Sequence, residues 1–244
     1  MVSPPDLSIV IPAYNERHRL PTTLADIDHV LTGTTQSYEV IVSDDGSTDG
    51  TDLLVAELAT GAPWLVLVRS DVNRGKGHAV KVGMQAARGT RVLFCDADGA
   101  TPMSELQRLH RALMEGADIV VGSRAIHAPG VVRDTKLHRR VMGRIYSWVF
   151  TARLAPGIRD TQCGFKLFTA AAAREVASRL SAPGFGFDVE IFVIARRLGL
   201  TVEEVAVSWH DQPGSKVRLG RDSVQMARDV LAVARRDRAG AYGP

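Results

Sequence analysis

The sequence predicts an α/β fold in which a mostly parallel, Rossmann-like sheet carries helices on both faces. Short apolar segments alternate with segments of helical spacing through residue 121, which is the order typical of parallel sheets. Hydrophobic residues make up 45% of the chain and charged residues 23%, as in ordinary soluble globular proteins. With 244 residues, the chain can bury a full core without disulfide or metal staples.

The first half contains a series of predicted strands with helices between them. Each strand is a short apolar run, and Pro12 is expected to end the first one. Each helical segment repeats apolar residues at helical spacing, and turns rich in glycine or aspartate separate the elements. The expected strands are residues 7–11, 38–42, 65–68, 92–95 and 119–121, and the expected helices are residues 16–31, 51–59, 77–87 and 103–114.

The order of elements is less regular after Gly122, where the chain becomes basic and mixed in character. No internal repeat or linker is visible, so we expect one domain, residues 1–244. Its parts are two functional halves, residues 1–124 and 125–220, and a C-terminal helix and tail, residues 221–244. The elements expected after Gly122 are strands at 164–168 and 202–207, helices at 170–180, 187–198 and 221–236, and a frayed tail at 239–244.

Bulk composition argues against a disulfide-rich, zinc-binding, membrane-spanning or nucleic-acid-binding protein. The two cysteines, Cys95 and Cys163, cannot build a disulfide framework or a zinc pattern, so we expect free thiols in a reducing compartment. No signal peptide and no run of about 18 apolar residues is present, which predicts a soluble or peripheral protein at the cytoplasmic face of a membrane. The net charge of +3 is too small to indicate nucleic acid, whereas basic clusters at 133–144 and 228–238 indicate phosphates or an anionic surface.

Polar side chains gather where the predicted strands end, and ligands of open parallel sheets bind at that edge. Asp96 and Asp98 follow the fourth strand, and residues two apart in an extended segment point the same way. Their hard oxygen atoms suit Mg²⁺ or Mn²⁺, which also bind substrate phosphates. The alternative for this motif alone is a turn whose aspartate caps the helix near Pro102. The other polar strand ends are residues 12–16, 44–45, 73–77 and 122–124.

Two of these strand ends offer further ligands for a substrate. Asp44 comes first after the second strand, and its carboxylate can accept a hydrogen bond from a base or a ribose hydroxyl, whereas Asp49 and Gly50 are expected to serve the turn. The alternative is that Asp44 also bonds only its own turn. Lys76, in the glycine-rich loop 73–77 before a helix, can meet a phosphate. A plain capped turn is the alternative there.

Taken together, these motifs resemble glycosyltransferase family 2. A second group of segments is similar to the dolichyl-phosphate glucosyltransferase branch, which is close to the polyprenyl-phosphate mannose synthases. The resemblance extends over residues 7–220 and implies a GT-A fold. It also implies inverting transfer of a sugar, with glucose favoured, from a UDP-sugar to a polyprenyl phosphate. The first group is residues 9–16, 44–51, 73–77, 96–101 and 122–124, and the second is residues 160–166, 187–190, 209 and 214–216.

The resemblance also implies roles for individual residues, with the nucleotide-sugar in the first half of the chain and the acceptor in the second. Asp98 binds the metal, Asp96 faces the ribose or the metal, and Lys216 meets the donor diphosphate or the acceptor phosphate. Where the mannose synthases offer a glutamine ligand, this chain has Ala100. The residues expected to act in catalysis are Asp98, Asp160 and Arg124. The nucleoside contacts are Pro12, Ala13, Tyr14, Glu16 and Asp44, and the acceptor phosphate contacts are Arg124, Arg139 and Arg140.

The nature of the acceptor decides whether a general base is needed. A phosphate acceptor is already anionic, so the metal and nearby cations have the harder task of stabilising the leaving nucleoside diphosphate. A neutral sugar acceptor needs a carboxylate base, for which Asp160, Asp188 and Glu190 are candidates. The alternative for Asp188 and Glu190 is helix-start capping and surface charge.

Residues 137–150 place Val141, Ile145, Trp148 and Val149 on one helical face behind a basic start. This pattern fits a helix in a membrane interface, although a core helix with solvated basic ends has the same pattern.

Three alternative functions stand beside transfer to a lipid. They are a family 2 enzyme with a soluble acceptor, a nucleotidyltransferase, whose glycine-rich loop after the first strand is missing here, and a non-catalytic nucleotide-sugar sensor.

Overall fold

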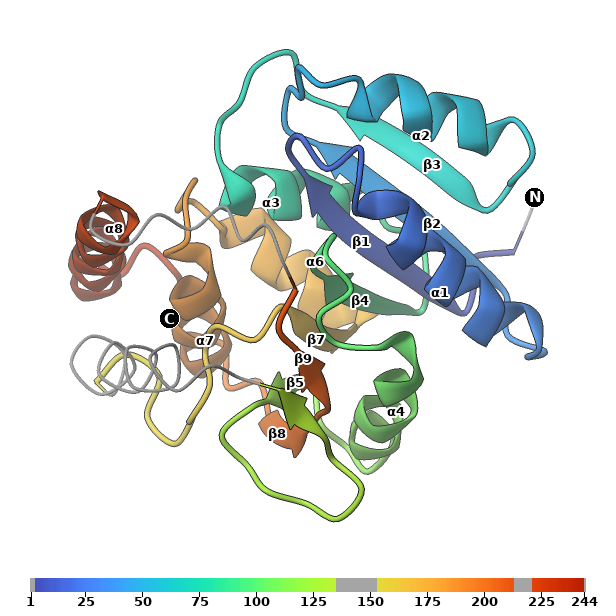
Figure 1. Cartoon of the computed structure of the whole chain (residues 1–244). Helices are drawn as coiled ribbons and strands as arrows, with labels where there is room; N and C mark the ends of the chain where they lie inside the picture. The colour runs from blue at the N-terminus through green and yellow to red at the C-terminus, as the bar shows by residue number, and fades with distance from the viewer. Residues whose placement is uncertain (1–2, 135–152, 213–220, 244) are drawn as a thin grey trace.

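The computed structural model describes residues 3–134, 153–212 and 221–243 and contains a seven-stranded main sheet (Figure 1). In sheet order, the strands are β3 (Leu65–Arg69), β2 (Tyr38–Asp44), β1 (Leu7–Ala13), β4 (Arg91–Cys95), β7 (Phe165–Thr169), β5 (Ile119–Ser123) and β8 (Val202–Ala206). Every strand of this sheet except β7 runs in the same direction. The prediction of a mostly parallel sheet is therefore confirmed.

The antiparallel strand β7 lies between β4 and β5, a place and direction that the sequence did not predict. Phe165, at the start of β7, pairs with Cys95, at the end of β4. An antiparallel strand begins at the edge where its neighbours end, so the segment before β7 reaches the carboxyl ends of β4 and β5. Asp160 lies in that segment and is brought to the same edge as Asp96 and Asp98.

Helices cover both faces of the sheet, as predicted (Figure 1). Alternate residues of β1 define the two layers, because Ile9 packs in one apolar cluster and Val10 in the other. The helices of the first layer are α1 (Leu20–Thr32), α2 (Thr51–Ala59) and α4 (Leu106–Met114), the last preceded by the 3₁₀ turn η1 (Met103–Glu105). The helices of the second layer are α3 (Lys76–Ala86), α6 (Ala170–Arg179), α7 (Phe187–Arg197) and α8 (Arg221–Arg238). In the described part of the chain, no helix combines the length and apolarity needed to cross a bilayer.

Several elements end at other residues than predicted. β1 runs through Pro12 to Ala13 instead of ending at Pro12. Beyond Val10, β1 pairs with β2 alone. Because its other side is unpaired there, the strand tolerates a proline, which has no backbone N–H to donate. β2 continues to Asp44, which pairs with Ala13. α1 begins only at Leu20, since the residues before it bond the turn after β2.

A second sheet, of two strands, was not predicted. It joins β6 (Arg133–Asp134) to β9 (Trp209–His210) in parallel. The His210 backbone N–H donates to the Ala100 carbonyl at 2.8 Å. β9 is thereby attached to the loop that follows β4, which carries Asp96 and Asp98.

The segment after α8 is anchored by Tyr242, although Ala239, Gly240 and Ala241 are exposed, which corrects the expectation that the tail frays. Tyr242 is 2% exposed, and its hydroxyl donates to Glu190 Oε1 at 2.7 Å. Arg196 and Arg197 of α7 form ion pairs with Asp237 of α8 at 2.7 and 2.6 Å. A buried aromatic ring and two ion pairs therefore hold this end of the chain against α7.

Candidate active site

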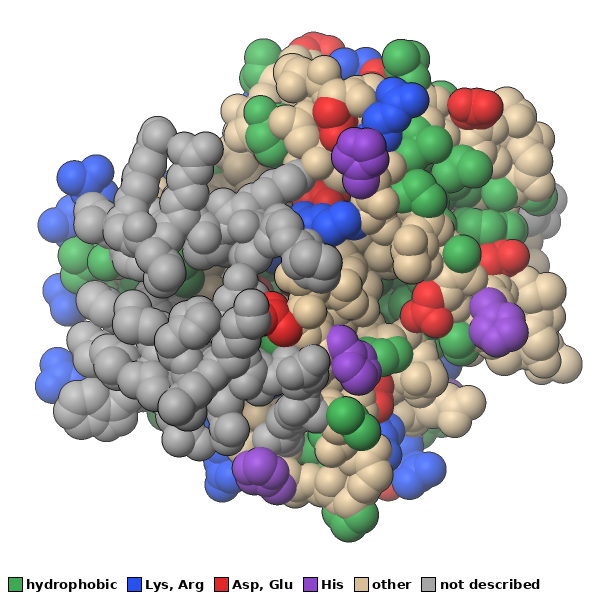
Figure 2. Space-filling view, viewed as in Figure 1, with side chains coloured by type: hydrophobic (Ala, Val, Ile, Leu, Met, Phe, Trp, Pro, Cys, Tyr) green, Lys and Arg blue, Asp and Glu red, His purple; other side chains and the backbone are tan. Residues whose placement is uncertain are grey.

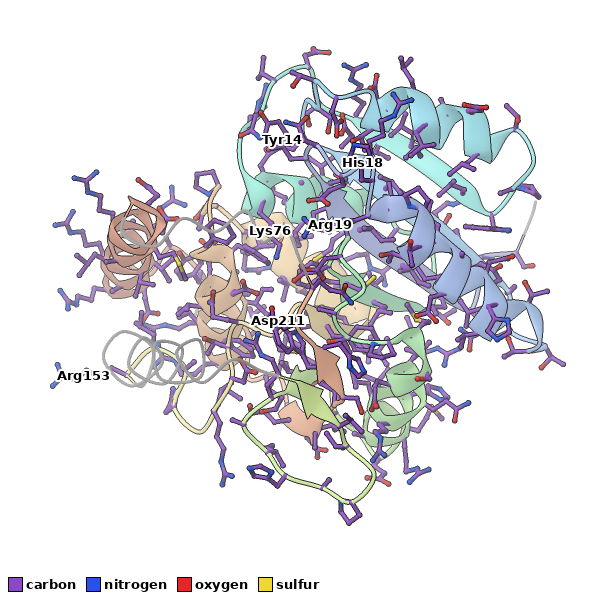
Figure 3. All side chains as sticks on the ribbon, viewed as in Figure 1. Tyr14, His18, Arg19, Lys76, Arg153 and Asp211 are labelled. Carbon is purple, nitrogen blue, oxygen red and sulfur yellow. The ribbon has the colours of Figure 1, made fainter. Side chains whose placement is uncertain are left out.

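The carboxyl ends of β1, β2, β4 and β5 meet at one edge of the sheet, together with the first turn of α3. Figure 3 shows Arg19 and Lys76 side by side near the centre of this edge, with Tyr14 above them and Asp211 below. Arg153 lies far to one side of this group. In Figure 2, acidic and basic side chains come together near the centre of the same face. The site is therefore built from charges of both signs.

Asp96 and Asp98 follow β4, and each carboxylate has a cation nearby. Lys76 Nζ forms an ion pair with Asp96 Oδ1 at 2.6 Å, and Arg19 Nη1 lies 4.0 Å from Asp98 Oδ2. Asp98 Oδ1 also accepts a hydrogen bond from the Ala100 backbone N–H at 3.1 Å. Burial, followed by the negative charge of Asp96, raises the pKa of Asp98. Additional positive charge at this place would therefore stabilise the two ionised carboxylates.

These residues fit a divalent metal ion as part of its coordination shell. The Asp98 side chain is 28% exposed, so its carboxylate is open to a ligand. Within residues 3–134, 153–212 and 221–243, no three His, Cys, Asp or Glu side chains gather closely enough to hold a metal by themselves. Mg²⁺ commonly binds one or two carboxylates and completes its shell with water and substrate phosphates. The two aspartates fit a metal that is shared with a diphosphate.

Gly164 lets the segment before β7 approach Asp96 closely. Its carbonyl accepts a hydrogen bond from the Asp96 backbone N–H at 3.0 Å. A Cβ at position 164 would lie 2.0 Å from Asp96 Oδ2, which is too close for any side chain to occupy without displacing the carboxylate. The adjoining Cys95 and Cys163 are both free thiols, as predicted, and both are buried. The sequence indicated a strand near Gly164, and only the packing shows why this residue is a glycine.

Arg19 is a residue of this edge that the sequence analysis missed. Its guanidinium donates to both carboxylate oxygens of Glu16, at 2.7 and 2.5 Å. Glu16 is 7% exposed, and its backbone N–H donates to Thr51 Oγ1 at 2.9 Å. Glu16, predicted as a nucleoside contact, thus also orients Arg19 beside Asp98. The spacing of Glu16 and Arg19, three residues apart, is a signal that could have indicated the pair.

The loops after β1 and β2 are bonded to each other. Asn15 has a φ of 55°, its backbone N–H donates to Ser47 Oγ at 2.8 Å, and its side-chain oxygen accepts from the Thr48 N–H at 2.8 Å. Asp44 is fully buried and accepts hydrogen bonds from the Ser47 hydroxyl and from the Ser47 N–H at 3.1 Å. Asp44 thus makes the turn contacts of the alternative interpretation, and its contact with a nucleoside stays a prediction. Asp49 bonds within the same turn, as expected.

Asp45, at one of the predicted polar strand ends, orders the segment that leads into α3. Its carboxylate accepts hydrogen bonds from the backbone N–H of Arg74 at 3.0 Å and of Gly75 at 2.7 Å. Gly75 has a φ of 110°, a conformation that residues with a Cβ rarely adopt. The glycine-rich loop is therefore held by Asp45, directly after β2, and it presents Lys76 to Asp96.

Arg124 and Asp160 form a bidentate ion pair at the end of β5. Arg124 Nε and Nη2 donate to the two Asp160 oxygens at 2.7 and 2.9 Å, and the Arg124 backbone N–H adds a third bond at 2.9 Å. Burial acts to raise the pKa of Asp160, but the guanidinium outweighs burial and holds that pKa below its usual value. Asp160 is therefore a poor general base. Burial likewise opposes the charge on Arg124, and Asp160 outweighs burial and raises the pKa of Arg124.

Asp188 and Glu190 are buried at the start of α7, so the alternative of surface charge does not apply to them. Asp188 forms an ion pair with Lys166 Nζ at 2.5 Å, and Lys166 is itself fully buried and donates to the Cys163 carbonyl at 2.7 Å. Glu190 accepts a hydrogen bond from the Ser181 backbone N–H at 2.9 Å. Both carboxylates are thus engaged inside the protein, Asp188 with a side chain of β7 and Glu190 with the loop before α7.

Four of the predicted features lie outside the described residues. They are the acceptor contacts Arg139 and Arg140, the phosphate contact Lys216, and the amphipathic segment 137–150. Their roles stay predictions. The structure brings together the predicted residues Asp96, Asp98 and Lys76, and the pair Arg124 and Asp160 lies at the same edge of the sheet.

Comparison with other proteins identifies related sequences over most of the chain. The profile of the Glycosyl transferase family 2 matches residues 8–177. A dolichyl-phosphate beta-glucosyltransferase of Dictyostelium discoideum is 38% identical over 240 residues, which cover 93% of this chain and 73% of the relative. The protein of the same name from Homo sapiens is 34% identical over 249 residues, which cover 97% of this chain and 77% of the relative.

Solved structures of glucosyl-3-phosphoglycerate synthase from Mycobacterium tuberculosis have a similar fold. The complex with phosphoglyceric acid superposes with a TM-score of 0.70 at 22% identity and covers 94% of this chain and 80% of that one. The complex with Mn²⁺, uridine diphosphate and phosphoglyceric acid has a TM-score of 0.68 at 22% identity and covers 98% of this chain and 80% of that one. At this identity the similarity concerns the fold, and it confirms the predicted GT-A architecture.

Proposed function

Because this chain belongs to glycosyltransferase family 2 and is a glycosyltransferase, we propose that it transfers glucose from a UDP-sugar to dolichyl phosphate or another polyprenyl phosphate, with inversion at the anomeric carbon. Relatives that are named for transfer of glucose to dolichyl phosphate support this choice. The observation in the structure that carries the proposal is the carboxylate pair Asp96 and Asp98 set between Lys76 and Arg19.

We assign the donor diphosphate to this group of charges. Asp98 and Asp96 would hold Mg²⁺ or Mn²⁺, and the bound ion would supply Lewis-acid stabilisation of the leaving diphosphate. Lys76 and Arg19 are already held in place by Asp96 and Glu16, so they can stabilise developing negative charge without reorganising. A related fold crystallised with Mn²⁺ and uridine diphosphate supports the assignment.

We assign the acceptor phosphate to Arg124, together with Arg139 and Arg140. An oxygen of the acceptor phosphate forms a bond to the anomeric carbon as the bond from that carbon to the donor diphosphate breaks. The electron pair of the broken bond stays on the diphosphate. The attacking oxygen carries no proton to remove, which agrees with the lowered pKa of Asp160. Asp160 then has the task of orienting Arg124, whose side chain remains 31% exposed and open to an anion.

The remaining predicted contacts complete this proposal. The first half of the chain, residues 1–124, would hold the nucleotide-sugar, and residues 125–220 would hold the acceptor. Lys216 would meet one of the two phosphate groups. A peripheral contact through residues 137–150 would bring the protein to the cytoplasmic face of a membrane. The nucleoside contacts would be Pro12, Ala13, Tyr14, Glu16 and Asp44.

A transfer assay with paired donors and acceptors tests the proposal. The protein would be incubated with Mn²⁺ and radiolabelled UDP-glucose, UDP-N-acetylglucosamine or GDP-mannose, with either dolichyl phosphate in detergent or 3-phosphoglycerate as acceptor. We expect label in the lipid extract only with UDP-glucose and dolichyl phosphate. Label on 3-phosphoglycerate without a lipid product would replace the proposal with a soluble acceptor. Tight donor binding without transfer to either acceptor would indicate a nucleotide-sugar sensor.

A further inference from the structure

The segment after α8 folds back onto α7 and buries Tyr242. Its hydroxyl donates to Glu190 Oε1 at 2.7 Å, and the side chain is 2% exposed. Figure 1 shows the C-terminal end of the chain beside α7. Neither Tyr242 nor Glu190 belongs to the donor or acceptor contacts proposed above. Their contact nevertheless lies at one end of a series of hydrogen bonds, joined by short stretches of backbone, that reaches the donor site.

Glu190 connects Tyr242 to the loop between α6 and α7. Its buried carboxylate accepts hydrogen bonds from the backbone N–H groups of Ser181 at 2.9 Å and Ala182 at 2.8 Å, and from the Ser181 hydroxyl. With the Tyr242 hydroxyl, four donors satisfy one carboxylate. A buried acceptor that loses a donor pays a desolvation penalty, so this set of bonds fixes the loop.

The next residue of that loop holds the first turn of α3. The Pro183 carbonyl accepts hydrogen bonds from the backbone N–H groups of Gly77 at 2.8 Å and His78 at 3.3 Å. The contact is close, because a Cβ on Gly75 would lie 2.4 Å from the Pro183 oxygen and a Cβ on Gly77 would lie 2.1 Å from the Ala182 oxygen. The helix start that these contacts hold also carries the side chain that pairs with Asp96.

We infer that Tyr242 is a positioning residue for the donor site. Tyr242 holds Glu190, and Glu190 holds the loop at residues 181–182. The loop then sets the helix turn from which Lys76 reaches Asp96 at 2.6 Å. This role rests on the proposed function, since Lys76 is assigned there to the donor diphosphate. Charged groups in an active site act through their position, so a small displacement of Lys76 weakens donor binding.

A pair of matched substitutions tests the inference. Tyr242→Phe removes one hydroxyl from the buried carboxylate, and Tyr38→Phe removes a similar hydroxyl bond, to Asp28 Oδ1 at 2.9 Å, at the amino end of β2 away from the site. We expect Tyr242→Phe to raise the Kd of uridine diphosphate with Mn²⁺ about three- to tenfold, or ~0.7–1.4 kcal/mol at 1.4 kcal/mol per factor of ten. Its KM for UDP-glucose should rise in the same ratio while its KM for dolichyl phosphate stays constant. Tyr38→Phe should leave all three values unchanged.

Amide hydrogen exchange provides a readout that needs no substrate. In Tyr242→Phe, the amides of Gly77 and His78 should exchange faster than in the parent protein, whereas Tyr38→Phe should leave them unchanged. If Tyr242→Phe proves too unstable to assay, Ser181→Ala removes another hydroxyl from the same carboxylate. Parent-like exchange, Kd and KM in a folded variant would overturn the inference. Absence of uridine diphosphate binding by the parent protein would overturn the proposed function instead.

Discussion

Replacing Gly164 by alanine should separate activity from stability. The added Cβ would lie 2.0 Å from Asp96 Oδ2 and 2.2 Å from Asp96 Cγ. Since Cβ atoms keep at least 3.0 Å from other atoms, the Asp96 carboxylate must move by at least 1.0 Å. A misplacement of about 1 Å in an active site can cost about 100-fold in rate. The displaced carboxylate would lose its ion pair with Lys76, so we expect about that loss of glucose transfer.

The cost in stability should be much smaller. The obstructing atoms are the end of a side chain that can rotate, and Gly164 itself does not have a positive φ. We expect the free energy of unfolding to fall by about 1 kcal/mol, the centre of the range for point mutants. Gly33→Ala is the matched control, because no atom lies within 4 Å of its added Cβ and its φ is −77°.

The assay compares turnover of UDP-glucose, Mn²⁺-dependent binding of uridine diphosphate and unfolding in denaturant for the three proteins. Gly33→Ala should match the parent protein in all three measurements. Full transfer activity in Gly164→Ala would show that the position of Asp96 does not matter to the reaction. A loss of activity that is explained entirely by the loss of folded protein would show that Gly164 serves the fold alone.

Three further predictions follow from the charges of the site and core. Asp98→Ala should abolish transfer and the metal-dependent part of uridine diphosphate binding while the melting temperature is retained; activity that persists in this variant or in excess chelator contradicts the metal assignment. Arg124→Ala should raise the KM for dolichyl phosphate at least tenfold, about 1.4 kcal/mol, with the Kd of uridine diphosphate unchanged; a change confined to the donor would reassign this arginine. Lys166→Met should lower the free energy of unfolding by about 3–5 kcal/mol, because it leaves a buried carboxylate unpaired, and Lys166→Met with Asp188→Leu should recover most of it. Equal stability of the parent and the single variant, measured in denaturant, would contradict this account of the pair.

The sequence by itself determined the fold class, most elements and the edge of the sheet that carries the charges. Apolar runs and helical spacing are local properties, so residues 38–42 and 51–59 indicated their strand and helix directly. The rule that ligands bind at the carboxyl ends of parallel strands then pointed to Asp96 and Asp98. The predicted ends of elements were less accurate where they depend on neighbouring strands. At Pro12, for example, β1 continues because one side of the strand is unpaired there.

Only the tertiary structure decided how distant segments complete this edge. The antiparallel insertion of β7 between β4 and β5 brings Asp160 to Arg124, a contact between residues 36 apart in the chain. The bond from Tyr242 to Glu190 spans 52 residues, and it buries Tyr242 in a tail that was expected to fray. Spacing along the chain reports which face of one element is apolar, but it contains no information on which element lies opposite. That choice is made by strand pairing and by the pairing of buried charges, which exist only in the folded chain.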